Sequence, residues 1–401
     1  MDVRFRVSKF LRLIPLGLGL AALGGAPASA QAAALSGLRS SELGLALLSE
    51  AERSQHFLGN SYAVPVLIAL AVLLVLFWFV FTGPLLVSEH IDDPGTKKER
   101  ELADPDSKFV RVHGYDLHYK ELGQGERVFL LFNGFATSLM SWRKVMQPLA
   151  KLGRVIAFDR LGMGLSAHPV RGDWARTGKS PYAPSMAPEF AIGLMDQLGI
   201  QKAILVGHSA GGSVVLRTAL KYPQRVVAIV VAGADWISTG IMPQASLHRL
   251  WDTLRMHHLG AWAFNALFGF SNAGMMIKLG YHDASRCSRE ELAALEKYYH
   301  VHNVGVALWE YAAANEKNTL AATVQNIRLP ALLIAGDDDR VVPARDQVKL
   351  SERIAGSQLR IIKDCGHLPQ EEQPEAFVSA VRQFVEQLPP PENPTDRHAS
   401  S

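Results

Sequence analysis

The sequence has few cysteines and no long run of basic residues. Its 401 residues include two cysteines, Cys287 and Cys365. That number leaves room for one bridge and excludes a disulfide framework and a cysteine-only metal site. The formal net charge is only +3, so we expect no nucleic-acid partner. There is no internal repeat, and nothing in the sequence calls for a cofactor or a metal ion.

The first thirty residues are typical of a targeting segment. Arg4, Arg6, Lys9 and Arg12 precede the apolar run LIPLGLGLAALGG, and Ala28-Ser29-Ala30 follows. A basic start, an apolar middle and an A-x-A site form the layout of a secretory signal peptide. We therefore predict a signal-peptide-like segment over residues 1–30, with an uncleaved amphipathic anchor as the alternative.

A second apolar stretch, residues 62–87, is long enough to cross a membrane. It contains no charged residue and exceeds the roughly 20 residues that a spanning helix needs. We predict a single-pass transmembrane helix here, in a bacterial inner membrane, between linkers at 31–61 and 88–106. Lys97, Lys98 and Arg100 follow the stretch, so the positive-inside rule favours the cytoplasm for the rest of the chain. A buried soluble helix is the alternative.

From residue 107 onward, short apolar runs alternate with segments of helical spacing. The runs RVFLLF, RVIAFD, KAILVGHS, RVVAIVVAGA and LPALLIAG are typical of strands covered on both faces. This alternation predicts an α/β fold with a mostly parallel sheet and helices on both of its faces. The alternation stops over residues 235–328, where we predict an inserted helical cap. The core is thus expected at 107–234 and 329–388, followed by a disordered tail at 389–401.

The motif G-x-S-x-G occurs where one predicted strand runs directly into a helix. Residues 207–211 read GHSAG, and a sharp strand-to-helix turn with small neighbours exposes a serine as a nucleophile. We therefore predict Ser209 as the nucleophile. A glycine-rich turn with an incidental serine is the alternative. A serine at this position, rather than an aspartate, disfavours dehalogenase and epoxide-opening chemistry.

Two later loops supply an acid and a base. GDDDRVVP places Asp337, Asp338 and Asp339 after one predicted strand, and GHLPQEEQP places His367 after the last one. A serine nucleophile needs a base, and the base needs a carboxylate that orients it. The chain order serine, acid, histidine is the order used on this kind of sheet.

From about residue 108 to residue 388 the sequence resembles the α/β-hydrolase superfamily, including its capped esterases, lipases and C–C hydrolases. The motifs that carry the resemblance are FDRLGMGLSAHP, GHSAGG, GDDDRVVP and GHLPQEEQPEAF. The resemblance implies Asp339 as the acid and His367 as the base, with Asp337 and Asp338 as neighbours only. It also implies a structural role for His208, and loop-organising roles for Asp159 and Arg160.

The resemblance also implies an oxyanion hole with two backbone donors. One is the N–H of Ala210, directly after the nucleophile, and by position the other is the N–H of Phe135. Asn133-Gly134 precedes Phe135 where the superfamily usually has His-Gly. An Asn-Gly pair taken alone predicts a hairpin turn, but a parallel sheet requires the strand to continue into a loop.

These features predict a membrane-anchored serine hydrolase. We expect it to cleave carboxylic esters, lipophilic or acylglycerol-like, through an acyl-enzyme. Amide, thioester or C–C bond hydrolysis by the same triad is the enzymatic alternative. A catalytically silent ligand-binding protein with the same fold is an alternative of another class.

Overall fold

An eight-stranded sheet organises the part of the chain that the computed structural model describes, which is residues 97–174, 179–237, 278–314, 316 and 318–390. The strand order is β1-β2-β4-β3-β5-β6-β7-β8. The strands are β1 (Lys108–Val112), β2 (Tyr115–Leu122), β3 (Val128–Phe132), β4 (Arg154–Phe158), β5 (Ala203–His208), β6 (Val226–Ala232), β7 (Ala331–Gly336) and β8 (Gln358–Ile362). The hairpin β1–β2 and the pair β2–β4 are antiparallel, and every other pair is parallel. The mostly parallel sheet predicted from the alternating pattern is confirmed.

The central strands are buried because both of their faces are covered. Every residue of β5 and β7 is buried, which explains why these segments are continuous apolar runs rather than alternating ones. The register pairs Phe132, the last residue of β3, with Gly207 in β5. The loops that follow these two strands therefore leave the sheet side by side, at the edge where α/β proteins place their sites.

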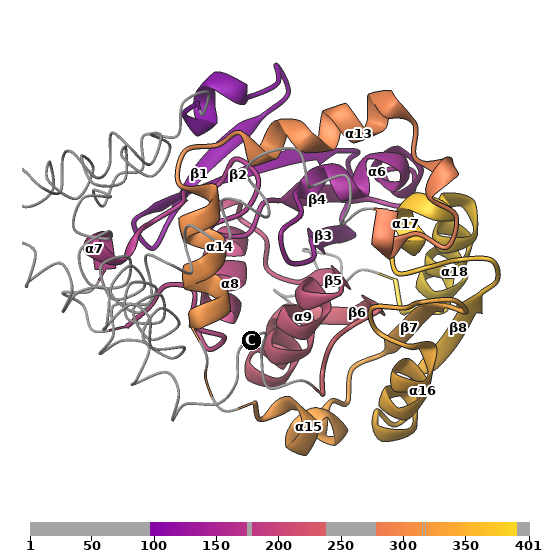
Figure 1. Ribbon diagram of the computed structural model, residues 1–401. Coiled ribbons are helices and arrows are strands. Elements are labelled where there is room, and N and C mark those ends of the chain that lie inside the picture. The colour runs from indigo at the N-terminus through magenta and orange to yellow at the C-terminus, as the bar shows by residue number, and fades with distance from the viewer. Residues whose placement is uncertain (1–96, 175–178, 238–277, 315, 317, 391–401) are drawn as a thin grey trace, which may run out of the picture. The chain divides into compact units, whose positions relative to one another are not determined.

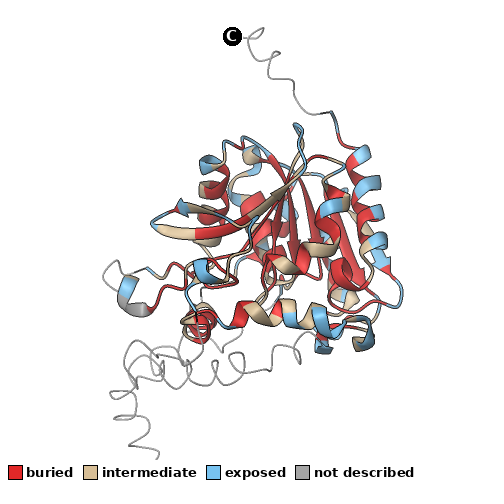
Figure 2. Cartoon of the chain, turned by 90° about the horizontal axis from the view of Figure 1, so that it is seen from above, coloured by how far each residue is buried: buried red, intermediate tan, exposed pale blue. Residues whose placement is uncertain are grey.

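Helices cover the sheet on two sides (Figure 1). One hydrophobic cluster joins it to α8 (Ala187–Gln197), α9 (Ala210–Lys221) and α16 (Ala344–Arg353). A second cluster joins it to α6 (Arg143–Leu149) and α18 (Pro374–Glu386). In Figure 2 the sheet and the inward sides of these helices are the buried parts, and the outward sides of the helices are exposed.

The remaining described elements are short helices. They are η2 (Glu99–Leu102), η3 (Leu139–Trp142), α7 (Arg171–Trp174), η5 (Pro223–Arg225), η7 (Ala284–Arg286), α13 (Arg289–Glu296), η8 (Lys297–Tyr299), α14 (Val304–Ala313), α15 (Leu320–Thr323), η9 (Val324–Asn326) and α17 (Pro369–Glu372). Those between residues 278 and 328 form the described part of the predicted cap, which contains helices and no named strand. Helix α13 starts with a capping box in which Ser288 and Glu291 bond each other's backbone N–H groups.

The last ten residues of the predicted linker 88–106 pack against the cap. The N–H of Lys97 donates to the carbonyl of His300 at 2.9 Å, and the N–H of His302 donates to the carbonyl of Lys97 at 3.0 Å. Asp104 lies 2.6 Å from Lys297 in the cap and 2.8 Å from Lys120 in β2. This segment therefore ties the edge of the sheet to the cap.

Several predicted segments lie outside the described residues. These are the signal-peptide-like segment 1–30, the linker 31–61, the predicted transmembrane helix 62–87, cap residues 238–277 and nearly all of the tail. Among the residues that are described, no helix combines the length and the apolar character that a membrane span requires.

Candidate active site

Ser209 occupies a strained turn between β5 and α9. Its backbone has φ 53° and ψ −122°, a conformation that non-glycine residues avoid and that is concentrated at functional sites. The glycines of the motif allow the close approach. A Cβ at Gly207 would lie 2.6 Å from the carbonyl oxygen of Gly211, and a Cβ at Gly211 would lie 2.3 Å from that of Phe132. The helix that follows starts at Ala210, and the N–H groups of Gly212 and Ser213 in its first turn donate to the carbonyl of Ser209 at 2.9 and 3.3 Å.

His367 is paired with one of the three candidate aspartates. Its Nδ1 lies 2.8 Å from Oδ2 of Asp339, and both side chains are buried. The other carboxylate oxygen of Asp339 accepts from the N–H groups of Val341 at 2.9 Å and Val342 at 2.8 Å. These bonds fix the carboxylate and leave one oxygen for the imidazole. Asp338 instead bonds His282 at 2.8 Å, and Asp337 lies 3.6 Å from Lys363.

Residues at the ends of β5 and β6 place the His367–Asp339 pair close to Ser209. The N–H of Ser209 donates to the carbonyl of Ala232 at 2.8 Å. The next residue, Gly233, has φ 55°, and a Cβ there would lie 3.2 Å from both the His367 ring and Oδ2 of Asp339. The ring centroid of His208, beside the nucleophile, lies 4.7 Å from that of His367. The structure thus gathers Ser209, His367 and Asp339 at the carboxyl edge of neighbouring strands.

His208 holds the backbone of the neighbouring histidine. Its Nε2 donates to the carbonyl of His367 at 2.7 Å, so the proton sits on Nε2 and Nδ1 carries a lone pair. Burial, together with the charge of His367, lowers the pKa of His208 to about 3. The ring is therefore neutral at physiological pH. The sequence predicted a structural role for His208 but not this contact, because hydrogen bonds across 159 residues leave no local pattern.

The loop that carries His367 is held by a second group that sequence reasoning missed. Glu372 accepts from the N–H of Gly366 at 2.9 Å through Oε1, and from the N–H of His282 at 2.8 Å through Oε2. Burial raises the pKa of this carboxyl. The N–H of His367 itself donates to the carbonyl of Gly280 at 2.6 Å. A returning cap segment, Gly280–His282, therefore binds the histidine loop directly.

The Asn133-Gly134 pair starts a loop and not a hairpin. Strand β3 pairs in parallel with β4 and β5, so the chain cannot fold straight back. A Cβ on Gly134 would lie 3.4 Å from Cβ of Ser209, which places this glycine against the predicted nucleophile. The Asn133 amide donates to the carbonyl of Thr137 at 2.6 Å and is fully buried. The side chain thus closes the loop on itself.

Asp159 fixes the same loop from the other side. Its Oδ1 accepts from the N–H of Leu139 at 2.6 Å, and its Oδ2 accepts from that of Leu165 at 2.8 Å. His118 contacts the same Oδ2 through Nδ1 at 2.7 Å. All of these groups are buried, so Asp159 organises two loops and does not face the reacting groups.

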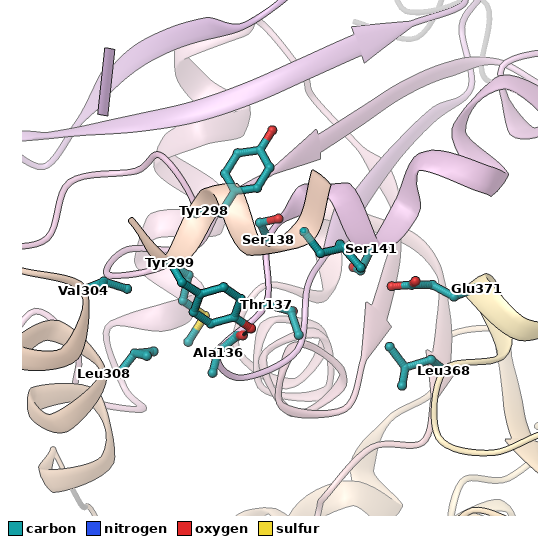
Figure 3. Close-up of a pocket in the computed structure, with 13 residues that line it drawn as sticks. Ala136, Thr137, Ser138, Ser141, Tyr298, Tyr299, Val304, Leu308, Leu368 and Glu371 are labelled. Carbon is teal, nitrogen blue, oxygen red and sulfur yellow. Dashed lines mark hydrogen bonds between the residues drawn. The ribbon is translucent and has the colours of Figure 1, made fainter. Parts of the chain in front are cut away.

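A small pocket lies between the loop after β3 and the cap (Figure 3). Its volume is about 20 Å³, which is room for roughly one water molecule. Ala136, Thr137 and Ser138 line one side, and Tyr299, Val304 and Leu308 of the cap line the other. Tyr299 donates to the carbonyl of Ala136. Within the described ranges, no group of three or more histidine, cysteine or acidic side chains is arranged to hold a metal ion.

The alpha/beta hydrolase fold family matches residues 127–374, which include the Ser209 turn, the loop after β3 and both loops of the His–Asp pair. This chain belongs to the alpha/beta hydrolase fold family. It is 32% identical over 240 residues to the 2-hydroxymuconate semialdehyde hydrolase of Pseudomonas putida, covering 58% of this chain and 76% of that relative. It is 30% identical over 300 residues to the 2-hydroxy-6-oxononadienedioate/2-hydroxy-6-oxononatrienedioate hydrolase of Paraburkholderia xenovorans (strain LB400), covering 70% and 95%.

Solved structures show the same architecture. A meta-cleavage product hydrolase from Pseudomonas fluorescens IP01 is 25% identical, with a TM-score of 0.54 over 70% of this chain and 97% of that one. A thermophilic esterase from Thermogutta terrifontis is 21% identical, with a TM-score of 0.56 over 70% and 98%. The esterase shares the fold, and the likeness goes no further.

Proposed function

We propose that this chain is a serine hydrolase that forms an acyl-enzyme on Ser209, with His367 as the base and Asp339 as its partner. The observation that carries the proposal is the strained serine at the N-terminus of α9 beside a buried imidazole–carboxylate pair. A protein that only bound a ligand would have no use for a strained nucleophile, a buried base and an orienting carboxylate together.

The proposed reaction has two steps, acylation of Ser209 and hydrolysis of the acyl-enzyme. His367 takes the proton of Ser209 as the serine oxygen bonds to the substrate carbonyl, and Asp339 stabilises the imidazolium that forms. The carbonyl oxygen becomes an oxyanion, for which the N–H groups of Ala210 and Phe135 are the donors. The bond to the leaving group then breaks and that group takes the proton from His367. Water, deprotonated by the same histidine, cleaves the acyl-enzyme.

A fluorophosphonate probe tests this proposal because it reacts only with an activated serine. We expect the wild-type chain to be labelled and Ser209→Ala to be unlabelled, because the substitution removes the nucleophile. Ser351→Ala, at a half-buried position in α16, is the matched control and should label like the wild type. A folded wild-type protein that takes no label would refute the hydrolase proposal.

Carboxylic esters are the substrate class that we place first. An ester needs only the serine, the base and the two oxyanion donors, since its alkoxide leaving group accepts a proton readily. Chromogenic esters of increasing acyl length test this assignment on the full chain. A rate that peaks at long acyl chains supports a lipophilic substrate, and activity on acetyl or butyryl esters alone contradicts it.

C–C bond hydrolysis is the second candidate, and the curated relatives favour it. The two relatives named above are hydrolases of 2-hydroxymuconate semialdehyde and of 2-hydroxy-6-oxo dienedioates. The same acyl-enzyme route serves both classes, but the leaving group is then carbon and needs its proton delivered to carbon. Incubation with 2-hydroxymuconate semialdehyde, followed by loss of its absorbance, compares this class directly with the esters. A kcat/KM at least about a hundredfold above that for the best ester would decide for C–C cleavage.

Membrane anchoring by residues 62–87, with the catalytic part in the cytoplasm, is a proposal that rests on sequence alone. Extraction of cell membranes at alkaline pH tests the anchor, since a spanning helix resists it. Protease protection of intact cells tests the side. Release of the full chain into the supernatant would contradict the anchor.

A further inference from the structure

A buried cation lies beneath the oxyanion loop. Arg160, two residues after the end of β4, is 6% exposed. Its guanidinium donates to the carbonyl of Asn133 at 2.9 Å, to the carbonyl of Gly134 at 3.0 Å and to the hydroxyl of Tyr311 at 2.9 Å. Among the described residues it forms no ion pair with a carboxylate, and the adjacent Asp159 is already bonded to two backbone N–H groups. A buried charge without a counter-ion is costly, so its neutral partners matter.

One of these partners belongs to the peptide group that matters most for the proposed chemistry. The carbonyl of Gly134 and the N–H of Phe135 are two ends of a single planar peptide unit, and they point in opposite directions. A guanidinium at the oxygen end fixes the plane of that unit. It also draws electrons from the nitrogen end, which makes the N–H a stronger donor, as in any chain of polarised hydrogen bonds. The unit lies beside Ser209, because Gly134 packs against that residue.

We propose that Arg160 is a positioning residue that orients and polarises the Gly134–Phe135 peptide, so that the Phe135 N–H stabilises the oxyanion. This role rests on the proposed serine-hydrolase function. Asn133 takes part from the other side, since its Oδ1 accepts from the N–H of Arg160 at 3.4 Å. Arg160 and Asn133 thus hold the loop through its backbone and not from the substrate side.

The same cation ties the loop to the cap. Tyr311 lies in α14, and its ring centroid is 5.4 Å from that of Phe135. A purely structural reading would have Arg160 act as this tie alone. The two roles differ in what they affect: loss of a tie loosens the cap and changes KM and stability, whereas loss of polarisation lowers kcat and weakens binding of oxyanionic inhibitors.

Substitution in the full chain separates these roles. Arg160→Gln keeps a donor but removes the charge, and Arg160→Lys keeps the charge but cannot reach both carbonyls at once. Arg127→Gln is the matched control, because Arg127 also donates to backbone carbonyls, Val385 at 2.7 Å among them, next to the amino end of β3. Tyr311→Phe removes the tie to the cap alone.

We expect kcat on an activated ester to fall about 10- to 100-fold in Arg160→Gln, less than the loss of a whole oxyanion donor. KM should stay within about threefold, and Arg160→Lys should recover part of kcat. The inhibition constant of a trifluoromethyl ketone should rise in parallel with the loss of kcat/KM. Oγ of Ser209 bonds to the ketone carbon of this inhibitor, His367 takes the serine proton, and the ketone oxygen becomes an oxyanion. Arg127→Gln should stay within about twofold of the wild type.

Three results would overturn the proposal. They are a folded Arg160→Gln with kcat within twofold of the wild type, an inhibition constant that does not follow kcat/KM, and a Tyr311→Phe variant with the whole loss of kcat. If neither Arg160 variant folds, wild-type protein labelled with 15N-phenylalanine decides the matter. The Phe135 amide proton should move downfield when the inhibitor adduct forms, and an unmoved resonance would refute the role. A wild type that neither takes a fluorophosphonate nor turns over ester refutes the proposed function instead.

Discussion

At the residue scale, His208 shows how burial sets the charge of a group beside the reacting centre. Its Nε2 is committed to the carbonyl of His367, and its Nδ1 has no hydrogen-bond partner among the described residues. An imidazole in this position cannot be protonated without placing a second positive charge next to His367 and near Arg160. Both of these charges lower its pKa further, after burial itself. The ring therefore positions the base without competing with it for protons.

This depressed pKa predicts a particular loss of stability in acid. The folded-state pKa of about 3 lies below the unfolded value of about 6.5. Between these two pH values the unfolded chain binds one proton more, so stability falls as the pH falls. The His208 contribution to the slope is about 1.4 kcal/mol per pH unit. Urea unfolding at pH 5.5, 5.0 and 4.5, between the two pKa values, should show a wild-type slope steeper by about this amount than that of His208→Gln, whose amide can keep the bond to His367. Equal slopes would contradict the prediction.

The sequence already singled out the residues that the structure brings together as the proposed reacting groups. Ser209 stood in a motif whose local context, strand then helix, carries its own physical reason. The three adjacent aspartates were different, because only the resemblance selected Asp339. In the structure that residue alone turns its carboxylate to His367, since two backbone N–H groups of the following turn hold it. Asn133 departs from the superfamily pattern, and residue spacing could not predict its role. Its hydrogen bond to the Thr137 carbonyl forms only when the loop is folded.

At the scale of elements, the loops at the carboxyl edge are packed so tightly that some positions have room only for glycine, which has no Cβ. Gly164 in the loop after β4 has φ 57°, and a Cβ there would lie 2.0 to 2.3 Å from the carboxyl atoms of Asp159. Asp159 in turn accepts from the N–H of Leu139, the first residue of η3. The backbone conformation of Gly164 thus determines the position of Asp159, and Asp159 in turn holds the neighbouring loop.

Gly164→Ala should therefore lower the free energy of unfolding by about 3 kcal/mol or more, since the side chain displaces a buried, bonded carboxylate. Gly114→Ala is the matched control. Gly114 also has positive φ, at 88°, but nothing lies within 4 Å of its added Cβ, so only the backbone cost of about 1–2 kcal/mol is expected. Chemical denaturation of both variants provides the comparison. A similar loss in the two would show that the contact with Asp159 relaxes freely.

Sequence pattern predicted the core elements well for a physical reason. Continuous apolar runs and helical spacing reflect burial, and burial is what these strands and helices experience. The hairpin signal of Asn133-Gly134 conflicted with this pattern, and the parallel neighbours of β3 override it. The contacts of Arg160 could not be predicted from sequence pattern, because they join residues far apart in the chain. The residue itself lies in the motif FDRLGMGLSAHP.

At the scale of the whole molecule, the segment before the first strand belongs to the fold. From the sequence, residues 88–106 are predicted as a linker between the apolar stretch and the core. In the structure Lys97 exchanges two backbone hydrogen bonds with cap residues, and Asp104 pairs with lysines of the cap and the sheet. Burial raises the pKa of Asp104, but the hydrogen bonds and charges of Lys120 and Lys297 outweigh it and lower the pKa to about 2.

A chain that starts at Ser107 should consequently be less stable than one that starts at Lys97. We expect its Tm to be lower by at least about 2–4 °C, the shift that 1 kcal/mol produces in a domain of this size, and its ester turnover to be lower because the cap loses this tie. Differential scanning calorimetry and a turnover assay on the two truncated chains make the comparison. Asp104→Asn in the longer chain isolates the ion pairs from the backbone bonds. Identical melting of the two chains would show that residues 97–106 contribute nothing.

The segment Gly280–His282 has a consequence for any attempt to alter the specificity of this enzyme. Caps look like interchangeable modules, because they are inserted between two strands of a constant core. Here the returning end of the cap supplies the carbonyl that accepts from the N–H of His367, and a Cβ at Gly280 would lie 2.3 Å from the side chain of Leu368. A chimaera that receives its whole cap from a relative would therefore lose a native contact that supports His367, the proposed base. A grafted cap should therefore be joined before Gly280, so that the recipient keeps its native contact between Gly280 and the histidine loop.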